Sequence, residues 1–200
     1  MPKLGMEPIR REQICRAAAT VIAREGFAGT TLRKVADEAG VSTGMLNHYF
    51  TNRQDLLTQT LVFVSERTQK RTRDAIENVP AGWERLTALL DSALFDGVAA
   101  NEGWRVWINA YGEAVHLPEL RKTIETRLQS WYQVLDEALE GLVDTESHAT
   151  IPWSWRLDAV LNGLAIQALA SEAPLDGPTI RDEVIRTLFP DAAPVPVAGD

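Results

Sequence analysis

Hydrogen-bonding side chains gather in one short stretch of the chain, residues 42–49, which reads STGMLNHY. The amide of Asn47 donates and accepts at once, and that pairing fits the edge of an adenine in the major groove of DNA. Thr43 and His48 add polar groups to the same segment, and Gly44 lets a backbone approach closely because it has no side chain. These residue types at this spacing are typical of a helix that reads base edges.

Two short helical segments must position these groups. Residues 31–39 form the first and residues 42–50 the second, with a tight turn between them. Gly40 can adopt the positive φ that ends the first helix, and the Ser42 hydroxyl can cap the second. Ala36 is small where the helices must cross. The apolar residues that can fill the wedge between them are Val35, Val41 and Leu46. The pattern predicts a helix-turn-helix, and a helical hairpin with a polar surface is the alternative.

Groups suited to phosphate oxygens flank this motif. Hydroxyls are carried by Thr31 and Tyr49, and positive charge is carried by Lys34 and Arg53. Contacts of this kind fix a protein on duplex DNA without reading its sequence. The predicted nucleic-acid site therefore comprises Thr31, Lys34, Ser42, Thr43, Gly44, Asn47, His48, Tyr49 and Arg53.

The total charge of the chain argues against a polyanion as partner, but the charge distribution does not. The 200 residues carry a formal net charge of −8, and the pI is about 5.0. Residues 1–60 hold eight Lys and Arg against six Asp and Glu, which is a net charge of +2. The remaining 140 residues hold 12 against 22, which is a net charge of −10. This asymmetry indicates that only the N-terminal part meets an anion.

Helical periodicity runs along the rest of the sequence. Pro8 and Gly26 bound a first helix, and Asn52 predicts the N-cap of a long helix over 52–78. No segment alternates with period two, so the fold is expected to be all-α. The Pro- and Ala-rich residues 191–200 are expected to form a disordered tail. Later helices are expected at about 82–96, 100–115, 118–142, 152–171 and 178–188.

Residues 30–57, TTLRKVADEAGVSTGMLNHYFTNRQDLL, resemble the start of the TetR family of transcriptional regulators. The segments MPKLGM, GVSTG and HYF look most like its BetI-type, choline-responsive subgroup. Most members have Tyr-x-His-Phe where this chain has Asn47, His48, Tyr49 and Phe50, so the aromatic phosphate contact is moved to Tyr49.

The resemblance implies a homodimeric repressor that binds a palindromic operator on double-stranded DNA. It implies a helix-turn-helix domain over residues 1–51, followed by a ligand-binding and dimerisation domain over residues 52–190. An unknown small-molecule inducer would release the operator. The long helix 52–78 would then act as the lever between the two sites.

Aromatic residues in the second half can line a ligand pocket. Trp104, Trp107 and Tyr111 recur at helical spacing, and Phe63 projects from the long helix. Trp131 and Tyr132 follow on the next helix. Indoles beside Glu113 and Asp91 would suit a cationic or amphipathic ligand through cation–π contact. For each of these aromatic residues taken singly, plain core packing is the alternative.

Two segments are expected to form a dimer interface. The apolar residues of 154–170 cover more than one helix face, which indicates burial both by the chain's own core and by a partner. A fully buried internal helix is the alternative. With the segment TIRDEVIRTLF, these residues would make a four-helix interface across a two-fold axis. The predicted interface residues are Leu157, Leu161, Leu164, Ile180, Val184 and Leu188.

Little in the sequence supports an enzyme. Glu113 and His116 form a single Glu-x-x-His pair, whereas di-iron bundles need a second copy. No phosphate-binding loop or serine elbow occurs, and the lone Cys15 falls beside an apolar helix face. We therefore expect no metal and no cofactor. No signal peptide or membrane span is predicted, so residence in the cytoplasm is expected. A helical ligand carrier or partner-binding protein without DNA binding is the remaining alternative.

Overall fold

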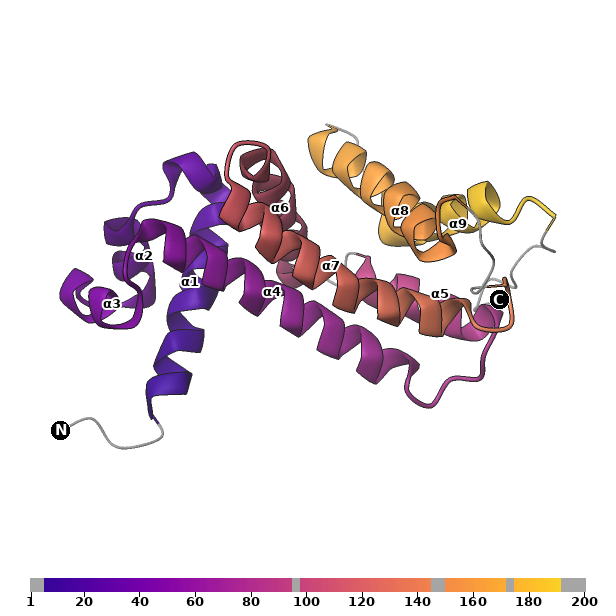
Figure 1. Cartoon of the computed structure of the whole chain (residues 1–200), viewed down its shortest axis with the longest axis horizontal. Helices are drawn as coiled ribbons and strands as arrows, with labels where there is room; N and C mark the ends of the chain where they lie inside the picture. The colour runs from indigo at the N-terminus through magenta and orange to yellow at the C-terminus, as the bar shows by residue number, and fades with distance from the viewer. Residues whose placement is uncertain (1–5, 95–97, 145–149, 172–174, 192–200) are drawn as a thin grey trace. The chain divides into compact units, whose positions relative to one another are not determined.

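A computed structural model describes residues 6–94, 98–144, 150–171 and 175–191. Within these ranges the chain forms nine α-helices and no strand, as predicted (Figure 1). The helices are α1 (Met6–Gly29), α2 (Leu32–Ala39), α3 (Thr43–Tyr49), α4 (Arg53–Ile76), α5 (Trp83–Ala93), α6 (Val98–Ala114), α7 (Pro118–Leu139), α8 (Trp153–Ala170) and α9 (Gly177–Leu188). Apart from Asp191, the predicted disordered tail lies outside the described residues.

Several helix ends follow from the residue types at them. Asn52 Oδ1 accepts a hydrogen bond from the Asp55 N–H at 2.9 Å, and the Asp55 carboxylate accepts from the Thr51 N–H at 2.9 Å. Together these two bonds fix the start of α4. At the start of α9, Asp176 accepts from the Thr179 N–H at 2.8 Å, and this bond lowers the pKa of the Asp176 carboxyl.

By its internal packing the chain divides into two compact units. The first unit comprises residues up to 68 together with residues 101–128. It therefore contains α1 to α3, most of α4, most of α6 and the first half of α7. One core cluster of this unit holds the helix-turn-helix in place and includes Ile14, Val35, Leu46, Phe50 and Leu56. A second cluster joins α1, α4 and α6 through Ile22, Phe27, Leu61, Val106 and Ala110.

The second unit comprises residues 69–100 and residues from 129 onward. Its helices are joined by polar as well as apolar contacts. Arg181 on α9 pairs with Asp91 on α5 at 2.9 Å. Phe189, which follows α9, stacks on Trp153 with ring centroids 5.6 Å apart and meets Trp83 edge to face at 5.1 Å. These contacts tie the ends of α5, α8 and α9 together.

Cys15 lies in the core of the first unit, where 4% of its surface is exposed. Burial raises the pKa of its thiol to about 11, because a thiolate loses its hydration there. The side chain acts as a small apolar filler in this core. Separately, none of the described helices is long and apolar enough to cross a membrane.

Candidate functional site

The turn between α2 and α3 is built as the sequence predicted. Gly40 adopts φ 65° and ψ 34°, the left-handed conformation that favours glycine. The Val41 N–H donates to the Ala36 carbonyl at 3.0 Å, which closes the end of α2. Ser42 Oγ accepts from the Met45 N–H at 3.1 Å and caps α3. Val35, Ala36 and Leu46 are buried between the helices.

The outward face of α3 carries the predicted base-reading residues. Thr43, Gly44, Asn47 and His48 are all exposed, whereas Tyr49 is half-buried and meets the His48 ring edge to face at 5.3 Å. Met45 is 42% exposed on the same helix and was missed by the sequence analysis. An exposed methionine is an apolar group that suits the methyl of thymine. The only signal for it was its position between two predicted contacts.

Two of the predicted phosphate contacts also have partners within the chain. Thr31 Oγ1 accepts from the Lys34 N–H at 3.3 Å and so caps α2. The Lys34 ammonium donates to the Glu25 carboxylate and to the Gly29 carbonyl, the latter at 2.9 Å. The bond to Lys34 lowers the pKa of Glu25, so the carboxylate stays ionised and partly neutralises this cation.

Arg53, at the start of α4, is turned toward the protein backbone. Its Nε donates to the Thr30 carbonyl at 2.6 Å, and its Nη2 donates to the Phe27 carbonyl. A cation that the sequence analysis did not consider lies at the other end of α3. Arg11 donates to the Tyr49 carbonyl at 3.4 Å, and its guanidinium lies 5.3 Å from the centroid of the Phe50 ring. The Arg10–Arg11 pair was the signal that could have identified it.

The predicted ligand residues of the first unit lie around one core cluster. Phe63, Trp107 and Tyr111 are half-buried and pack against the cluster between α1, α4 and α6. The rings of Trp107 and Tyr111 are 5.6 Å apart and tilted by 38°. Trp104 is half-buried on the same helix. Of the carboxylates expected near them, Asp91 belongs to the second unit and pairs there with Arg181.

A second aromatic group surrounds a buried carboxylate. Asp158 on α8 is 8% exposed, and its Oδ1 accepts from Trp131 Nε1 at 2.9 Å. Burial raises the pKa of this carboxyl to about 6, against an ordinary value of 3.8, although hydrogen bonds from Trp131 and Asn162 oppose the rise. Tyr132 meets Trp155 with ring centroids 5.5 Å apart. Among the described residues no cationic side chain pairs with Asp158.

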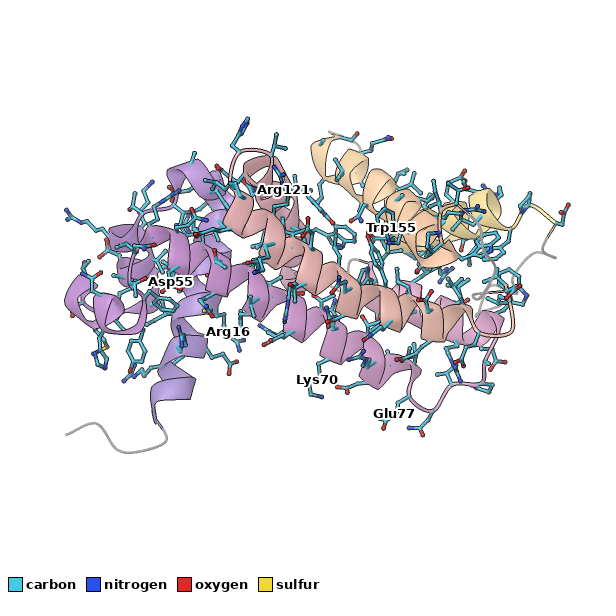
Figure 2. All side chains as sticks on the ribbon, viewed as in Figure 1. Arg16, Asp55, Lys70, Glu77, Arg121 and Trp155 are labelled. Atoms are coloured by element: carbon cyan, nitrogen blue, oxygen red, sulfur yellow. The ribbon has the colours of Figure 1, made fainter. Side chains whose placement is uncertain are left out.

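The predicted dimer residues lie mostly inside a single subunit. Leu157, Leu161, Ile180 and Val184 each have 0% of their surface exposed. Leu164 and Leu188 are half-buried. The large exposed apolar side chains of α8 are instead Trp155, at 54%, and Ile166, at 39% (Trp155 is labelled in Figure 2). Any partner that packs on α8 would therefore meet a different face from the one that the sequence analysis selected.

The chain matches two described protein families. Residues 14–60 match the bacterial regulatory proteins of the tetR family. Residues 83–190 match the C-terminal part of BetI-type transcriptional repressors. The first match contains the whole helix-turn-helix, and the second contains most of the second unit.

Curated relatives are similar over most of their length. The HTH-type transcriptional regulator BetI of an Escherichia coli strain is 31% identical over 186 residues, which is 89% of this chain and 91% of the relative. The BetI regulator of Vibrio campbellii is 30% identical over 151 residues, which is 73% of this chain and 74% of the relative.

Solved structures share the fold. A TetR-family regulator from Rhodococcus sp. superposes with a TM-score of 0.75 and 25% identity, covering 90% of this chain and 96% of that chain. A transcriptional regulator from Saccharomonospora viridis, solved in complex with choline, has the same TM-score and coverage at 23% identity. The chain therefore belongs to the TetR family, with a BetI-type C-terminal part, and it is a DNA-binding transcriptional regulator and not an enzyme.

Proposed function

We propose that the protein is a homodimeric repressor that binds a palindromic operator through α2 and α3 and is released from it by a small organic cation. DNA binding is supported by the exposed face of α3, which presents polar side chains. Gly40 ends α2 and Ser42 caps α3, so the helix-turn-helix holds this face in place. A face of this kind lies in the major groove when such a motif binds DNA.

Base reading is assigned to the exposed residues of α3. Asn47 pairs with an adenine edge, while Thr43 and His48 contact neighbouring bases, and Gly44 allows the backbone close to the groove. The exposed thioether of Met45 is added for contact with a thymine methyl. Ser42 serves this surface indirectly, because its hydroxyl is committed to the cap of α3.

Phosphate contacts are assigned to Thr31, Lys34 and Tyr49, and Arg11 is added to them. Lys34 can exchange its bond to Glu25 for a phosphate, since both partners lie at the surface. Arg53 is left out of this set because its guanidinium is already bound to two backbone carbonyls. Its role is to hold the segment between α1 and α2.

The exposed face of α8 is assigned as the surface on which a second copy of the chain packs. Trp155, Ala159 and Ile166 share one side of this helix and are all exposed. Gly163 lies on the same side, and apart from the adjoining backbone of α8 no heavy atom of the described residues lies within 4 Å of the position that a Cβ would occupy there. Two such faces can meet around a two-fold axis, which is the usual symmetry of a dimer. The two DNA-binding heads, formed by α1 to α3 of each subunit, would then read two half-sites.

The inducer is assigned to the class of small quaternary or primary ammonium compounds. Asp158 supports this class, because a buried carboxylate that has no cationic partner among the described residues attracts a ligand cation. Trp131 and Tyr132 lie beside it, and aromatic faces stabilise ammonium groups by cation–π contact. The choline complex of the Saccharomonospora viridis regulator, which has the same fold, is consistent with that class.

Two aromatic groups are candidates for the ligand site, and binding measurements distinguish between them. The cluster of Phe63, Trp104, Trp107 and Tyr111 was predicted from the sequence, whereas the group around Asp158 includes a buried carboxylate. Calorimetric titration of choline should show weaker binding to Asp158→Asn than to Trp107→Ala if the second group is the site. Weaker binding to Trp107→Ala alone would favour the first group.

The decisive experiment selects DNA with the purified protein. Genomic fragments retained by the protein are sequenced, and the selection is repeated with choline present. A regulator of the proposed kind enriches a palindromic sequence in the first selection and loses it in the second. Enrichment without a palindrome would contradict the dimeric mode, and enrichment that choline leaves unchanged would contradict the proposed inducer class. Because its target is genomic DNA, we place the protein in the cytoplasm.

A further inference from the structure

The backbone leaves the axis of α1 at one glycine. Gly26 has φ 71° and ψ 173°, a backbone conformation that residues other than glycine rarely adopt. The next residue, Phe27, turns its ring into the core, where 2% of its surface is exposed. Residues 26–30 then run to Thr31, which caps α2. The direction of this short link therefore sets where α2 and α3 lie relative to α1.

A side chain from α6 holds the link at this bend. Asn109 Oδ1 accepts a hydrogen bond from the Phe27 N–H at 3.1 Å. The same amide is oriented by its other end, because Asn109 Nδ2 donates to the Arg105 carbonyl one turn earlier in α6 at 2.8 Å. A Cβ on Gly26 would stand 3.0 Å from Asn109 Oδ1, so the Asn109 side chain would have to shift to admit any other residue there.

The other side of the link is held from within the head and from α4. Arg53 donates to the carbonyls of Phe27 and Thr30. Thr30 is fully buried, and its hydroxyl donates to the Gly26 carbonyl at 2.7 Å. The backbone of Phe27 is therefore bound on both sides: Asn109 on α6 accepts from its N–H, and Arg53 on α4 donates to its carbonyl.

We propose that Asn109 is a positioning residue for DNA binding: through the Phe27 amide it fixes the direction of the α1–α2 link and so the setting of the helix-turn-helix. The proposal rests on the dimeric operator proposed above, because the setting of a head matters most where two heads must fit a fixed half-site separation. Asn109 also lies between Trp107 and Tyr111 on α6, so a shift of this helix reaches the head through one hydrogen bond.

The test compares Asn109→Ala with Gly112→Ala in the full-length protein. Gly112 lies one turn further along α6, and apart from the adjoining backbone of α6 no heavy atom of the described residues lies within 4 Å of the position of its missing Cβ, so this change is the matched control. Operator DNA with native half-site spacing and DNA lengthened by one base pair between the half-sites are titrated with each protein. Amide exchange of Phe27 is measured by NMR without DNA.

Loss of the bond should relax the spacing preference. We expect the ratio of the two dissociation constants to fall about tenfold in Asn109→Ala, because a freer link lets each head follow the shifted half-site. The Phe27 amide should exchange about tenfold faster. Gly112→Ala should match the wild type in both measurements. A variant that is only less stable would bind both DNAs less well in equal proportion and keep the ratio.

The possible failures are distinguishable. If the wild type binds a single half-site as tightly as the pair, the dimeric operator is refuted, and the Phe27 exchange rate alone then decides whether Asn109 holds the link. If the wild type discriminates between the spacings and Asn109→Ala discriminates equally, the positioning role is refuted and the proposed function stands. Unchanged exchange of the Phe27 amide overturns the proposal in either case.

Discussion

Replacing Asp158 by asparagine should stabilise the folded protein at neutral pH. The carboxyl is 8% exposed, and burial raises its pKa to about 6 from an ordinary value of 3.8. The folded protein therefore holds this proton more tightly than the unfolded chain does. Asparagine keeps an oxygen that can accept from Trp131 Nε1, and it never has to lose a proton.

The size of the effect follows from the two pKa values. They differ by roughly two units, and each unit corresponds to about 1.4 kcal/mol, so the ionised carboxylate costs about 3 kcal/mol of stability above pH 6. Because the folded pKa is the higher one, this cost is absent below pH 3.8 and grows as the pH rises through the window from 3.8 to 6. The advantage of asparagine should be about 3 kcal/mol at pH 8 and about half of that at pH 5.

Thermal or urea unfolding of both proteins at pH 5 and pH 8 measures this difference. For a chain of this length, about 3 kcal/mol corresponds to a rise in Tm of roughly 6–12 °C. Asp74→Asn is the control, since the ion pair of Asp74 with Lys70 is exposed and its loss should change stability little. An Asp158→Asn protein that is less stable than the wild type at both pH values would refute the argument from burial.

Three further outcomes are expected. Asn47→Ala should lose discrimination at one base pair of each half-site, worth about 1–3 kcal/mol, in titrations of operator variants, and equal weakening on every sequence would contradict its role. Arg53→Ala should lower the free energy of unfolding by about 1–3 kcal/mol with the salt slope of operator binding unchanged, because two backbone carbonyls lose a charged donor. If the salt slope instead falls by about one per head, Arg53 contacts a phosphate after all. Trp107→Ala should bind the operator normally in the absence of ligand. If choline still releases the operator from this variant as it does from the wild type, the inducer site lies at Asp158.

Local signals predicted the helix-turn-helix well. The positive φ of Gly40 and the cap formed by Ser42 depend on residues within a few positions, and both were found where the sequence placed them. The starts of α4 and α9 follow from the same kind of short-range hydrogen bond. Sequence patterns are informative at this range because the partner groups are fixed by helix geometry.

Long-range partners could not be predicted in the same way. Arg53 precedes α4 and was expected to face phosphates, but its acceptors lie 23 and 26 residues earlier in the chain. Asp158 interrupts an apolar helix, and its carboxylate is buried with a hydrogen bond from the indole of Trp131, 27 residues away in the chain. The leucines of α8 recur on more than one face, so periodicity did not tell which of them the subunit buries itself.

The thiol of Cys15 has a consequence for experiments on this regulator. It is the single cysteine of the sequence, and with a pKa of about 11 only on the order of one thiol in several thousand is ionised at pH 7.5. Oxidants and alkylating reagents attack the thiolate, so the folded head should be almost inert to both. The rate at which a maleimide modifies Cys15 therefore reports how often the helix-turn-helix opens, and no engineered label is needed to follow it.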